Sequence, residues 1–301
     1  FGSGSGNDYA TIKYSAAGVP LWTNLFKGAG NGDDKARSLA VDASGNVYVT
    51  GYATGNGSSH DYATMKYSAA GAPLWTNLFN GATNSQDYAV SLALDGKANV
   101  YVTGYSFGIG SGFDYVTIKY STAGVPLWTN MFNGAGNNDD QACSLAVDSS
   151  GNVVVTGYSR DSGGHTDFAT IKYSTWGVAL WTNLFTGDTN SDNYPSSLAV
   201  DGSGNVYVTG YSVTYIVNFG DYVTIKYSGP SPAISASKIV GGSLVSTVTG
   251  LIADQKLISS ASTNLTSWTP IQTNIASGSS LTVTNPYSPD VTKQFYRILV
   301  Q

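Results

Sequence analysis

An eight-residue segment occurs five times along this chain of 301 residues at an almost constant spacing. Its first copy, Asp-Tyr-Ala-Thr-Ile-Lys-Tyr-Ser, occupies residues 8–15. The later copies begin at Asp61, Asp114, Asp167 and Asp221, so the spacings are 53, 53, 53 and 54 residues. A fixed period of this length is the signature of a repeat architecture, in which each unit buries its surface against the next. Four complete units are followed by one additional strand, 221–228.

The composition favours an all-β protein. The chain has 36 glycines and 21 tyrosines, and all 19 acidic residues are aspartate. Asp, Gly and Tyr are typical of turns and strands, whereas Glu is typical of helices. A net charge of −5 and a pI near 4.8 argue against nucleic acid as a partner. No apolar run reaches the ~18–20 residues of a membrane span, and the single cysteine, Cys143, excludes an intrachain disulfide.

Each unit contains four short runs with the alternation of β-strands, separated by turn residues. In the first unit these runs are 9–14, 21–26, 38–41 and 47–52. Four antiparallel strands in about 50 residues describe one blade of a β-propeller. We therefore predict about four four-stranded blades, with boundaries at 38–79, 91–132 and 144–185 and a last unit, 197–228, that lacks its outer strand.

One hairpin turn departs from the repeat. The turn between the third and fourth of these runs carries glycine at positions 45, 151 and 204, where a positive φ is wanted, but alanine at position 98. We expect the turn at Ala98 to be strained or differently shaped.

The repeated motifs D-Y-x-T-I-K-Y, L-W-T-N and S-L-A-V-D-x-S-G-N-V-Y-V-T-G-Y resemble the bacterial β-propeller repeat family that is often found in large secreted or cell-surface proteins. The resemblance covers residues 8–228. It implies propeller blades and an extracellular or cell-surface setting in a secreted bacterial protein, without a particular activity.

The periodic pattern ends near residue 228, and Gly-Pro-Ser-Pro-Ala at 229–233 is typical of a linker. Short alternating runs over 234–301 predict a small C-terminal β-sandwich after the repeat domain, 1–228. The segment 261–268 (A-S-T-N-L-T-S-W), together with F-Y-R-I-L at 295–299, resembles the terminal module of many secreted bacterial proteins. That resemblance implies export and display at the surface.

The additional strand raises the question of how the array closes. The N-terminus holds two strands without a complete blade, and the last unit lacks one strand, so strand edges remain unpaired and able to recruit another strand. We predict self-association by strand exchange between subunits, which makes filaments where head-to-tail contacts do not close into rings. The alternative is a monomer whose terminal strand caps an edge. The predicted assembly residues are Tyr9, Ile12, Tyr14, Tyr222, Ile225 and Tyr227.

The loop before each inner strand is rich in carboxylate and amide oxygens, which suit Ca²⁺. The candidate calcium ligands are Asn31, Asp33, Asp34, Asn84, Asp87, Asn137, Asp139, Asp140, Asn190 and Asp192. Asp and Asn are equally the residues that cap turns through their own backbone, and the spacing does not match an EF-hand. Turn capping is the favoured interpretation and calcium the alternative.

No nucleophile elbow, P-loop or zinc-ligand spacing occurs, so no catalytic residue is nominated and the expectation is that the protein is not an enzyme. The sequence favours an extracellular structural or scaffold protein that assembles into a fibre or surface layer. The alternative is a glycan- or calcium-dependent adhesion module.

Overall fold

A computed structural model describes residues 6–57, 59–187, 191–214, 220–228, 233–240, 243–249, 256–262, 269–275, 280–286 and 295–300. Two compact units divide the chain, Phe1–Tyr227 and Ser228–Gln301. Every regular element in the described ranges is a β-strand, so the predicted all-β class is confirmed. Those ranges contain no helix that could cross a membrane.

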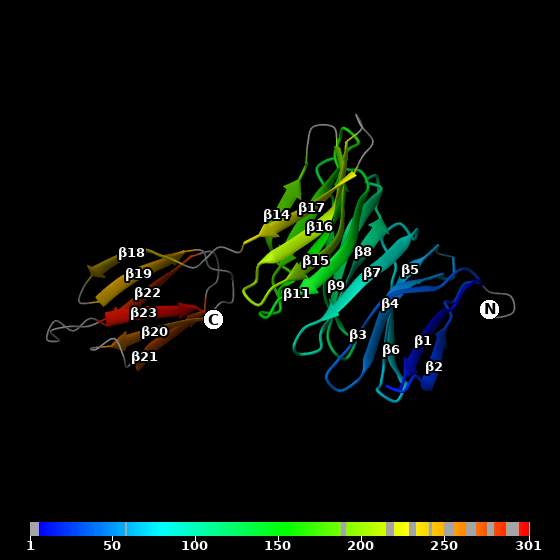
Figure 1. Cartoon of the computed structure of the whole chain (residues 1–301), viewed down its shortest axis with the longest axis horizontal. Coiled ribbons are helices and arrows are strands. Elements are labelled where there is room, and N and C mark those ends of the chain that lie inside the picture. The colour runs from blue at the N-terminus through cyan, green and yellow to red at the C-terminus, as the bar shows by residue number, and fades with distance from the viewer. Residues whose placement is uncertain are drawn as a thin grey trace. The chain divides into compact units, whose positions relative to one another are not determined.

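The first unit is a row of five antiparallel sheets, each made of strands consecutive in the sequence. Three sheets have four strands, as predicted for propeller blades, and lie between a two-stranded and a three-stranded sheet (Figure 1). The sheets are β1 (Tyr9–Tyr14) and β2 (Pro20–Phe26); β3 (Lys35–Val41), β4 (Val47–Ala53), β5 (Asp61–Tyr67) and β6 (Pro73–Phe79); β7 (Asp87–Leu94), β8 (Val100–Phe107), β9 (Phe113–Tyr120) and β10 (Pro126–Phe132); β11 (Asp140–Val147), β12 (Val153–Arg160), β13 (Thr166–Tyr173) and β14 (Ala179–Phe185); β15 (Ser191–Val200), β16 (Val206–Thr214) and β17 (Gly220–Tyr227).

The middle strands of each complete sheet are buried on both faces because neighbouring sheets cover them. Every residue of β4 and β5 is buried, whereas the outer strand β6 alternates between exposed and half-buried positions. The core therefore lies between sheets. Tyr48 and Tyr62 of one sheet, for example, pack with Leu92, Val102 and Ile118 of the next.

A β-bulge in the first strand of each large sheet is matched by a glycine in the second strand. The bulges lie between Ala36 and Ser38 and at the corresponding places in β7, β11 and β15. The opposing glycine, Gly51 in the first complete sheet, pairs with Ala36. Its Cβ, if present, would lie 2.0 Å from the Lys35 carbonyl oxygen, so only glycine fits beside this bulge.

The hairpin turn after each first strand is capped by an aspartate side chain. Asp42 Oδ1 accepts hydrogen bonds from the backbone N–H groups of Ser44 and Asn46, both at 2.9 Å, and the same bonds recur around Asp95, Asp148 and Asp201. At Ala98 the turn keeps this shape, with φ of 58°, close to the 78° of Gly45. The expectation of strain is confirmed, because Ala98 carries a Cβ at a positive φ. The alternative, a turn of different shape, is wrong, because the hydrogen bonds to Asp95 hold this turn in the same backbone conformation as the others.

We predict that replacing Ala98 by glycine raises the free energy of unfolding by about 1 kcal/mol, because a left-handed backbone costs a Cβ-bearing residue about that much. Urea denaturation of the two proteins measures the difference. The reciprocal control is Gly204→Ala, where φ is 79° and an added Cβ meets no atom within 4 Å, so that the backbone alone sets the cost. Equal stability of the Ala98→Gly variant and the parent chain would contradict the prediction.

The second unit consists of two three-stranded antiparallel sheets, ordered β18-β19-β22 and β21-β20-β23. Its buried side chains include Leu257 and Val283. Residue 268 and the predicted linker positions 229–232 lie outside the described residues, and the β-sandwich resemblance stays a prediction. The strands are β18 (Ala233–Val240), β19 (Ser243–Thr249), β20 (Lys256–Ser262), β21 (Thr269–Ile275), β22 (Ser280–Pro286) and β23 (Phe295–Val300).

Candidate assembly surfaces

Successive sheets of the first unit are joined by a repeating set of hydrogen bonds. The first bond comes from a tyrosine near the start of β1, β5 or β9, whose buried O–H donates to a carbonyl oxygen in β5, β9 or β13 of the next sheet. The pairs are Tyr9 to Ala63 at 3.3 Å, Tyr62 to Val116 at 3.2 Å and Tyr115 to Ala169 at 3.3 Å.

The second set of bonds converges on the turn between the third and fourth strands of the next sheet. Lys13 Nζ and Trp22 Nε1 donate to the Ala69 carbonyl oxygen at 2.9 and 3.2 Å, and Asn24 Nδ2 donates to that of Gly71 at 2.8 Å. The same three donors recur in the next two joints, where the acceptors are Thr122, Gly124, Thr175 and Gly177. The repeated lysine is thus a donor to a neighbouring turn.

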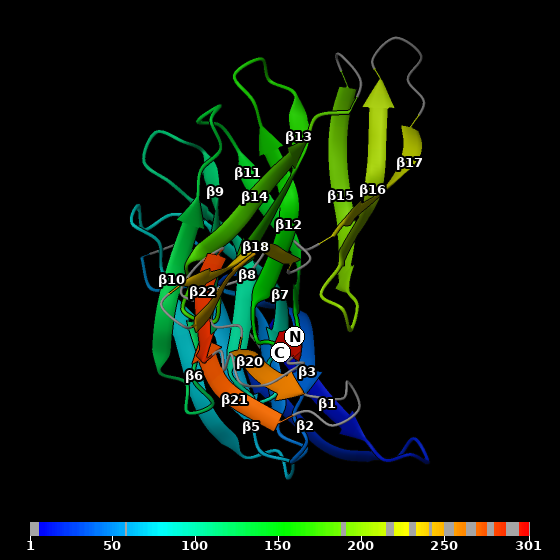
Figure 2. The same ribbon diagram turned by 90° about the vertical axis from the view of Figure 1, so that its left-hand side faces the viewer.

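The two incomplete sheets lie at opposite ends of this row (Figures 1 and 2). We call the β1–β2 sheet with the uncovered face of β3 the head, and the β15–β17 sheet with the outer strand β14 the tail. In the terms of a complete blade, the head has the third and fourth strands, and the tail has the first three.

Apolar side chains of the head are exposed because the β1–β2 sheet, as far as the structure describes it, has no first and second strands to cover them. Leu39 in β3 is 62% exposed, whereas the equivalent Leu92 in the next sheet is 7% exposed. Val41, Ile12 and Tyr14 are exposed on the same side of the head. Burial of such side chains contributes roughly 1.5–3 kcal/mol each, so the head is an incomplete core.

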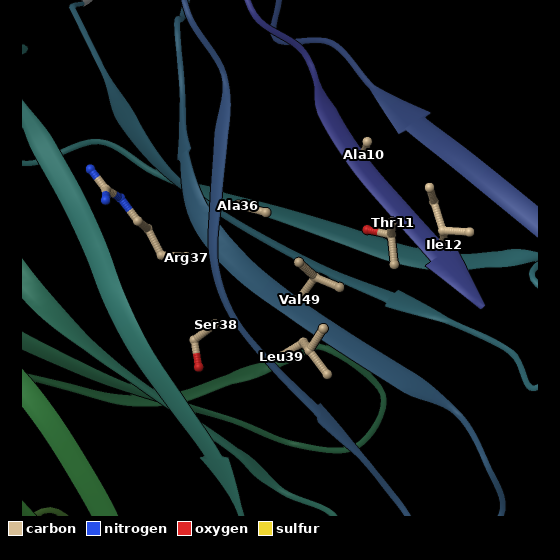
Figure 3. Close-up of a pocket in the computed structure, with 8 residues that line it drawn as sticks. All are labelled: Ala10, Thr11, Ile12, Ala36, Arg37, Ser38, Leu39 and Val49. Atoms are coloured by element: carbon tan, nitrogen blue, oxygen red, sulfur yellow. The ribbon is translucent and has the colours of Figure 1, made fainter. Parts of the chain in front are cut away.

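A hollow marks the place where the absent strands would lie. It has a volume of about 430 Å³ and lies between β1 on one side and β3 and β4 on the other. Figure 3 shows its lining residues, which are Ala10, Thr11, Ile12, Ala36, Arg37, Ser38, Leu39 and Val49. A second hollow of about 260 Å³ continues along β1 to Tyr14, Trp22 and Val47.

Strand β17 of the tail corresponds to β1 of the head, but the face of β17 that is exposed corresponds to the buried face of β1. Tyr222 in β17 is 97% exposed, although its equivalents Tyr9, Tyr62 and Tyr115 are each 1% exposed. Tyr211 beside it is also exposed, and the two line a hollow of about 380 Å³ with Ser196, Thr209, Gly210, Gly220 and Asp221. The other face of β17 is covered, since Ile225 and Tyr227 pack on the sheet before it.

Hydrogen-bond donors of the tail lack the turn that serves them elsewhere, because the β15–β17 sheet has no fourth strand among the described residues. Among the described residues, Trp181 Nε1 and Asn183 Nδ2 have no acceptor. Lys172, the third donor, instead pairs with Asp148 at 2.8 Å in its own sheet. That aspartate is available because Val154 replaces the tyrosine whose hydroxyl binds the aspartate in the other sheets.

The structure keeps the predicted assembly strands apart. Ile12 and Tyr14 lie exposed at the head, while Tyr9 is buried against the next sheet. Tyr222 lies exposed at the tail, and Ile225 and Tyr227 are half-buried. The sequence did not indicate that opposite faces of the same kind of strand are exposed at the two ends of the row. The signal available was that residues 9–26 match the third and fourth strands of a repeat, whereas residues 197–227 match the first three.

Three of the predicted calcium ligands are buried caps. Asp34, Asp87 and Asp140 each accept the backbone N–H of a glycine six residues earlier, at 2.7, 2.7 and 2.5 Å. Burial raises the pKa of Asp87 and Asp140. These carboxylates therefore hold the loop before the inner strand, as turn capping predicts.

A second row of candidates ties neighbouring sheets together. Asp33, Asp139 and Asp192 accept backbone N–H groups of Asn7, Phe113 and Thr166 in the preceding sheet, at 2.8, 3.0 and 2.9 Å. The hydrogen bond from the Asn7 backbone, with that from Lys35, lowers the pKa of Asp33.

The remaining candidates lie in the loops. Asn84 and Asn137 have positive φ angles and donate through Nδ2 to carbonyl oxygens of Gly57 and Gly110, and Asn31 is exposed. Asn190 lies outside the described residues. The described part of the chain holds no group of three or more His, Cys, Asp or Glu side chains placed for a metal ion. Calcium binding stays a prediction from the sequence.

A family model described as a beta-propeller repeat matches residues 22–57, 74–109 and 180–213. No curated protein matches the chain. Among solved structures, an endo-arabinase from Bacteroides thetaiotaomicron VPI-5482 is 11% identical, with a TM-score of 0.39, covering 85% of this chain and 94% of that one. An exo-beta-1,3-galactanase from Phanerochaete chrysosporium is 9% identical, with a TM-score of 0.26, covering 97% and 93%. A glycoside hydrolase matches at 9% identity and a TM-score of 0.30, covering 93% and 85%.

These matches correct one prediction. The expectation that the protein is not an enzyme was wrong, because the solved structures reported above carry the names of enzymes: an endo-arabinase, a glycoside hydrolase and an exo-beta-1,3-galactanase. At TM-scores below 0.5 and identities near 10%, the likeness carries no argument about a reaction or substrate of this chain.

Proposed function

The repeats of this chain belong to the beta-propeller repeat family, and on that premise we propose that the protein is a self-assembling scaffold whose head and tail complete one another. The setting that we propose is outside the cell or at the surface of a bacterium, as the sequence resemblance implies. The observation that carries the proposal is a pair of complementary incomplete sheets: in the part of the chain that the structure describes, the head has only the third and fourth strands of a blade, and the tail has only the first three.

In the proposed contact, one subunit supplies β15 and β16 and a second subunit supplies β1 and β2, which together make a four-stranded blade. Strand β1 takes the place of β17 beside β16. The two strands differ at a single position, since Tyr9-Ala-Thr-Ile-Lys-Tyr14 corresponds to Tyr222-Val-Thr-Ile-Lys-Tyr227. The register of β16 with β17 therefore transfers directly to β1.

The exposed groups of both ends find partners in this blade. Ile12 and Tyr14 replace Ile225 and Tyr227 on the preceding sheet, where Tyr227 lies 5.6 Å from Trp181 between ring centroids. The turn between β1 and β2 places the carbonyl oxygens of Ala16 and Gly18 at the positions that accept from Trp181 and Asn183. These positions are equivalent to Ala69 and Gly71, which serve Trp22 and Asn24.

The face of β3 is covered at the same time. In complete joints the first strand of one sheet packs on the next, and the Leu92 and Leu198 backbone N–H groups donate to Ser38 and Ser144 hydroxyls at 3.2 and 3.4 Å. The equivalent pair across subunits is the Leu39 N–H and the Ser197 hydroxyl. Because head and tail are different surfaces, the contact is heterologous and propagates into filaments unless the rotation closes a ring.

Strand β17 is the one expected to leave, because it is held more weakly than β1. Tyr9 and Lys13 of β1 donate hydrogen bonds to the following sheet, whereas within the first unit the described residues form no further sheet beyond β17. The two β1–β2 strands also keep their own tight turn through the Gly18 N–H to Ser15 carbonyl bond at 2.9 Å.

A disulfide experiment tests the proposal. In the complete sheets a threonine of the second strand faces one of the third strand, with hydroxyl oxygens 2.8, 3.0 and 3.0 Å apart. The corresponding pair across subunits is Thr209 with Thr11, and cysteines at such a pair have their sulfurs within bonding reach. One chain carries Thr11→Cys and another Thr209→Cys, both with Cys143→Ser, since serine occupies the equivalent position 196.

Mixing the two chains under mild oxidation should give a disulfide-linked dimer, and a chain with both cysteines should give a series of covalent multimers. The matched control replaces Thr209→Cys by Thr282→Cys, an exposed threonine of the second unit, and should not cross-link specifically to Thr11→Cys. A monomer with an intrachain disulfide would show that the row closes on itself and would overturn the proposal, as would the absence of dimer from the mixture.

A further inference from the structure

Three side chains in the second and third sheets depart from the repeat. Trp176 stands where the other turns between third and fourth strands have Ala17, Ala70 and Ala123. Lys97 stands where the other hairpins have Ser44, Ser150 and Ser203, and the next residue is the strained Ala98. Departures from a repeat that cost stability are retained at functional sites more often than elsewhere.

Two of these departures, Lys97 and Trp176, meet although they lie far apart in the sequence. Lys97 and Trp176 line one hollow of about 350 Å³ together with Asp95, Lys119, Leu127 and Ser150. Trp176 is 74% exposed, and Leu127 is also exposed. The hollow thus combines an open aromatic surface, a cation and small polar groups, which is the composition of a ligand site rather than of a core.

The walls of the hollow are rigid. Lys119 Nζ and Trp128 Nε1 both donate to the Thr175 carbonyl oxygen, at 2.9 and 3.1 Å, and so anchor the turn that presents Trp176. The Asp95 carboxylate accepts the backbone N–H groups of Lys97 and Asn99, both at 2.9 Å. A ligand would therefore meet preformed surfaces and would not have to order a loop.

The charges of the hollow favour an anion. Asp95 is occupied by four donors, among them the Tyr101 hydroxyl and the Asn99 side chain. Lys119 lies over the Tyr101 ring, 4.8 Å from its centroid, and is occupied by the Thr175 carbonyl. Lys97 is exposed, and no hydrogen bond or ion pair of its ammonium is seen among the described residues.

We propose that this hollow binds an acidic sugar, with the apolar face of the ring on the Trp176 indole and the carboxylate at the Lys97 ammonium. The hydroxyls of Ser149 and Ser150 lie in the same lining and suit the hydroxyl groups of a sugar. The hollow is formed by the second and third complete sheets and includes no residue of head or tail, so sugar binding is independent of assembly.

Titration calorimetry with short oligogalacturonates, and with neutral galactose oligomers of the same length, tests the proposal. The parent chain should bind the acidic oligomer in preference to the neutral one. Trp176→Ala restores the residue of the other repeats and should weaken binding of the acidic oligomer about tenfold or more. Lys97→Ser also restores the repeat and should weaken it about fivefold, the size expected of an exposed ion pair, while leaving the neutral oligomer unaffected.

Two matched variants control for loss of an exposed apolar group or of a positive charge elsewhere. Ile109→Ala and Lys27→Ser change exposed residues outside the hollow and should leave binding unchanged. No binding of the acidic oligomer by the parent chain, equal binding of acidic and neutral oligomers, or undiminished binding by Trp176→Ala would each overturn the proposal. Unfolding curves of the two repeat-restoring variants should coincide with that of the parent, which separates a binding effect from misfolding.

Discussion

Replacing Gly104 by alanine should lower the free energy of unfolding by about 3 kcal/mol or more, which is among the largest effects of any single methyl group in this protein. Gly104 in β8 lies opposite the bulge between Ala89 and Ser91. A Cβ there would lie 1.9 Å from the Tyr88 carbonyl oxygen and 2.9 Å from the Ala89 Cα. Both atoms belong to the backbone of the neighbouring strand, so the clash is relieved only by breaking the pairing of β7 with β8.

Urea denaturation followed by tryptophan fluorescence measures this effect, since five of the six tryptophans lie in the repeats. The matched control is Gly202→Ala, in an exposed turn, where an added Cβ meets no atom within 4 Å and φ is not positive. That variant should unfold at the same urea concentration as the parent within experimental error. A Gly104→Ala protein of parental stability would show that the bulge is not required in this sheet.

Replacing Asp140 by alanine should lower the free energy of unfolding by about 2 kcal/mol, because it removes the acceptor of the buried Gly134 N–H group. The carboxylate is fully buried and accepts the N–H groups of Gly134 and Arg160, at 2.5 and 3.2 Å. Without it the buried Gly134 N–H has no acceptor among the described residues, whereas the Arg160 N–H keeps the Asp139 carbonyl oxygen at 3.1 Å. The loop that enters the third complete sheet should then open, and hydrogen exchange at Gly134 should accelerate.

Asp140→Asn is the informative control. Burial raises the pKa of Asp140, so the charge itself is disfavoured at this position, while asparagine keeps an acceptor oxygen without a charge. Asn193 holds the equivalent place in the tail, so asparagine is accommodated there, although its Nδ2 donates to the Thr166 and Thr186 carbonyl oxygens and its Oδ1 accepts no hydrogen bond from the described residues. We expect Asp140→Asn to cost about 1 kcal/mol or less. A cost equal to that of Asp140→Ala would mean that the charge, and not the acceptor, stabilises the loop.

Much of the fold could be predicted from the sequence because the strands and turns of each repeat depend on residues that are close together in the chain. The period located four strands per unit, and the blade boundaries at 38–79, 91–132 and 144–185 agree with the ends of β6, β10 and β14. Turn residues mark the hairpins, since the aspartate caps and positive φ angles follow directly from Asp-x-x-Gly-Asn. The bulge could not be read in this way, because it depends on which residues of two strands lie opposite each other.

The candidate surfaces were predicted only in part. Counting strands indicated an unpaired edge, but residues with the same local sequence have opposite environments at the two ends. Tyr9 and Tyr222 both begin a Tyr-x-Thr-Ile-Lys-Tyr strand; one is buried beneath the next sheet and the other has no sheet beyond it. The hollow beside Trp176 was not indicated at all, because Lys97 and Trp176 meet only through the stacking of two sheets.

The sequence by itself thus determined the repeat, the strands within it and the turns that join them, since these depend on residues close together in the chain. Only the tertiary structure decided which face of each strand is covered, where the row of sheets lacks strands, and which departures from the repeat lie side by side. The physical reason is that burial in a repeat protein is supplied by the neighbouring unit. The sequence of one repeat therefore does not show whether the adjacent repeat has all the strands needed to cover it.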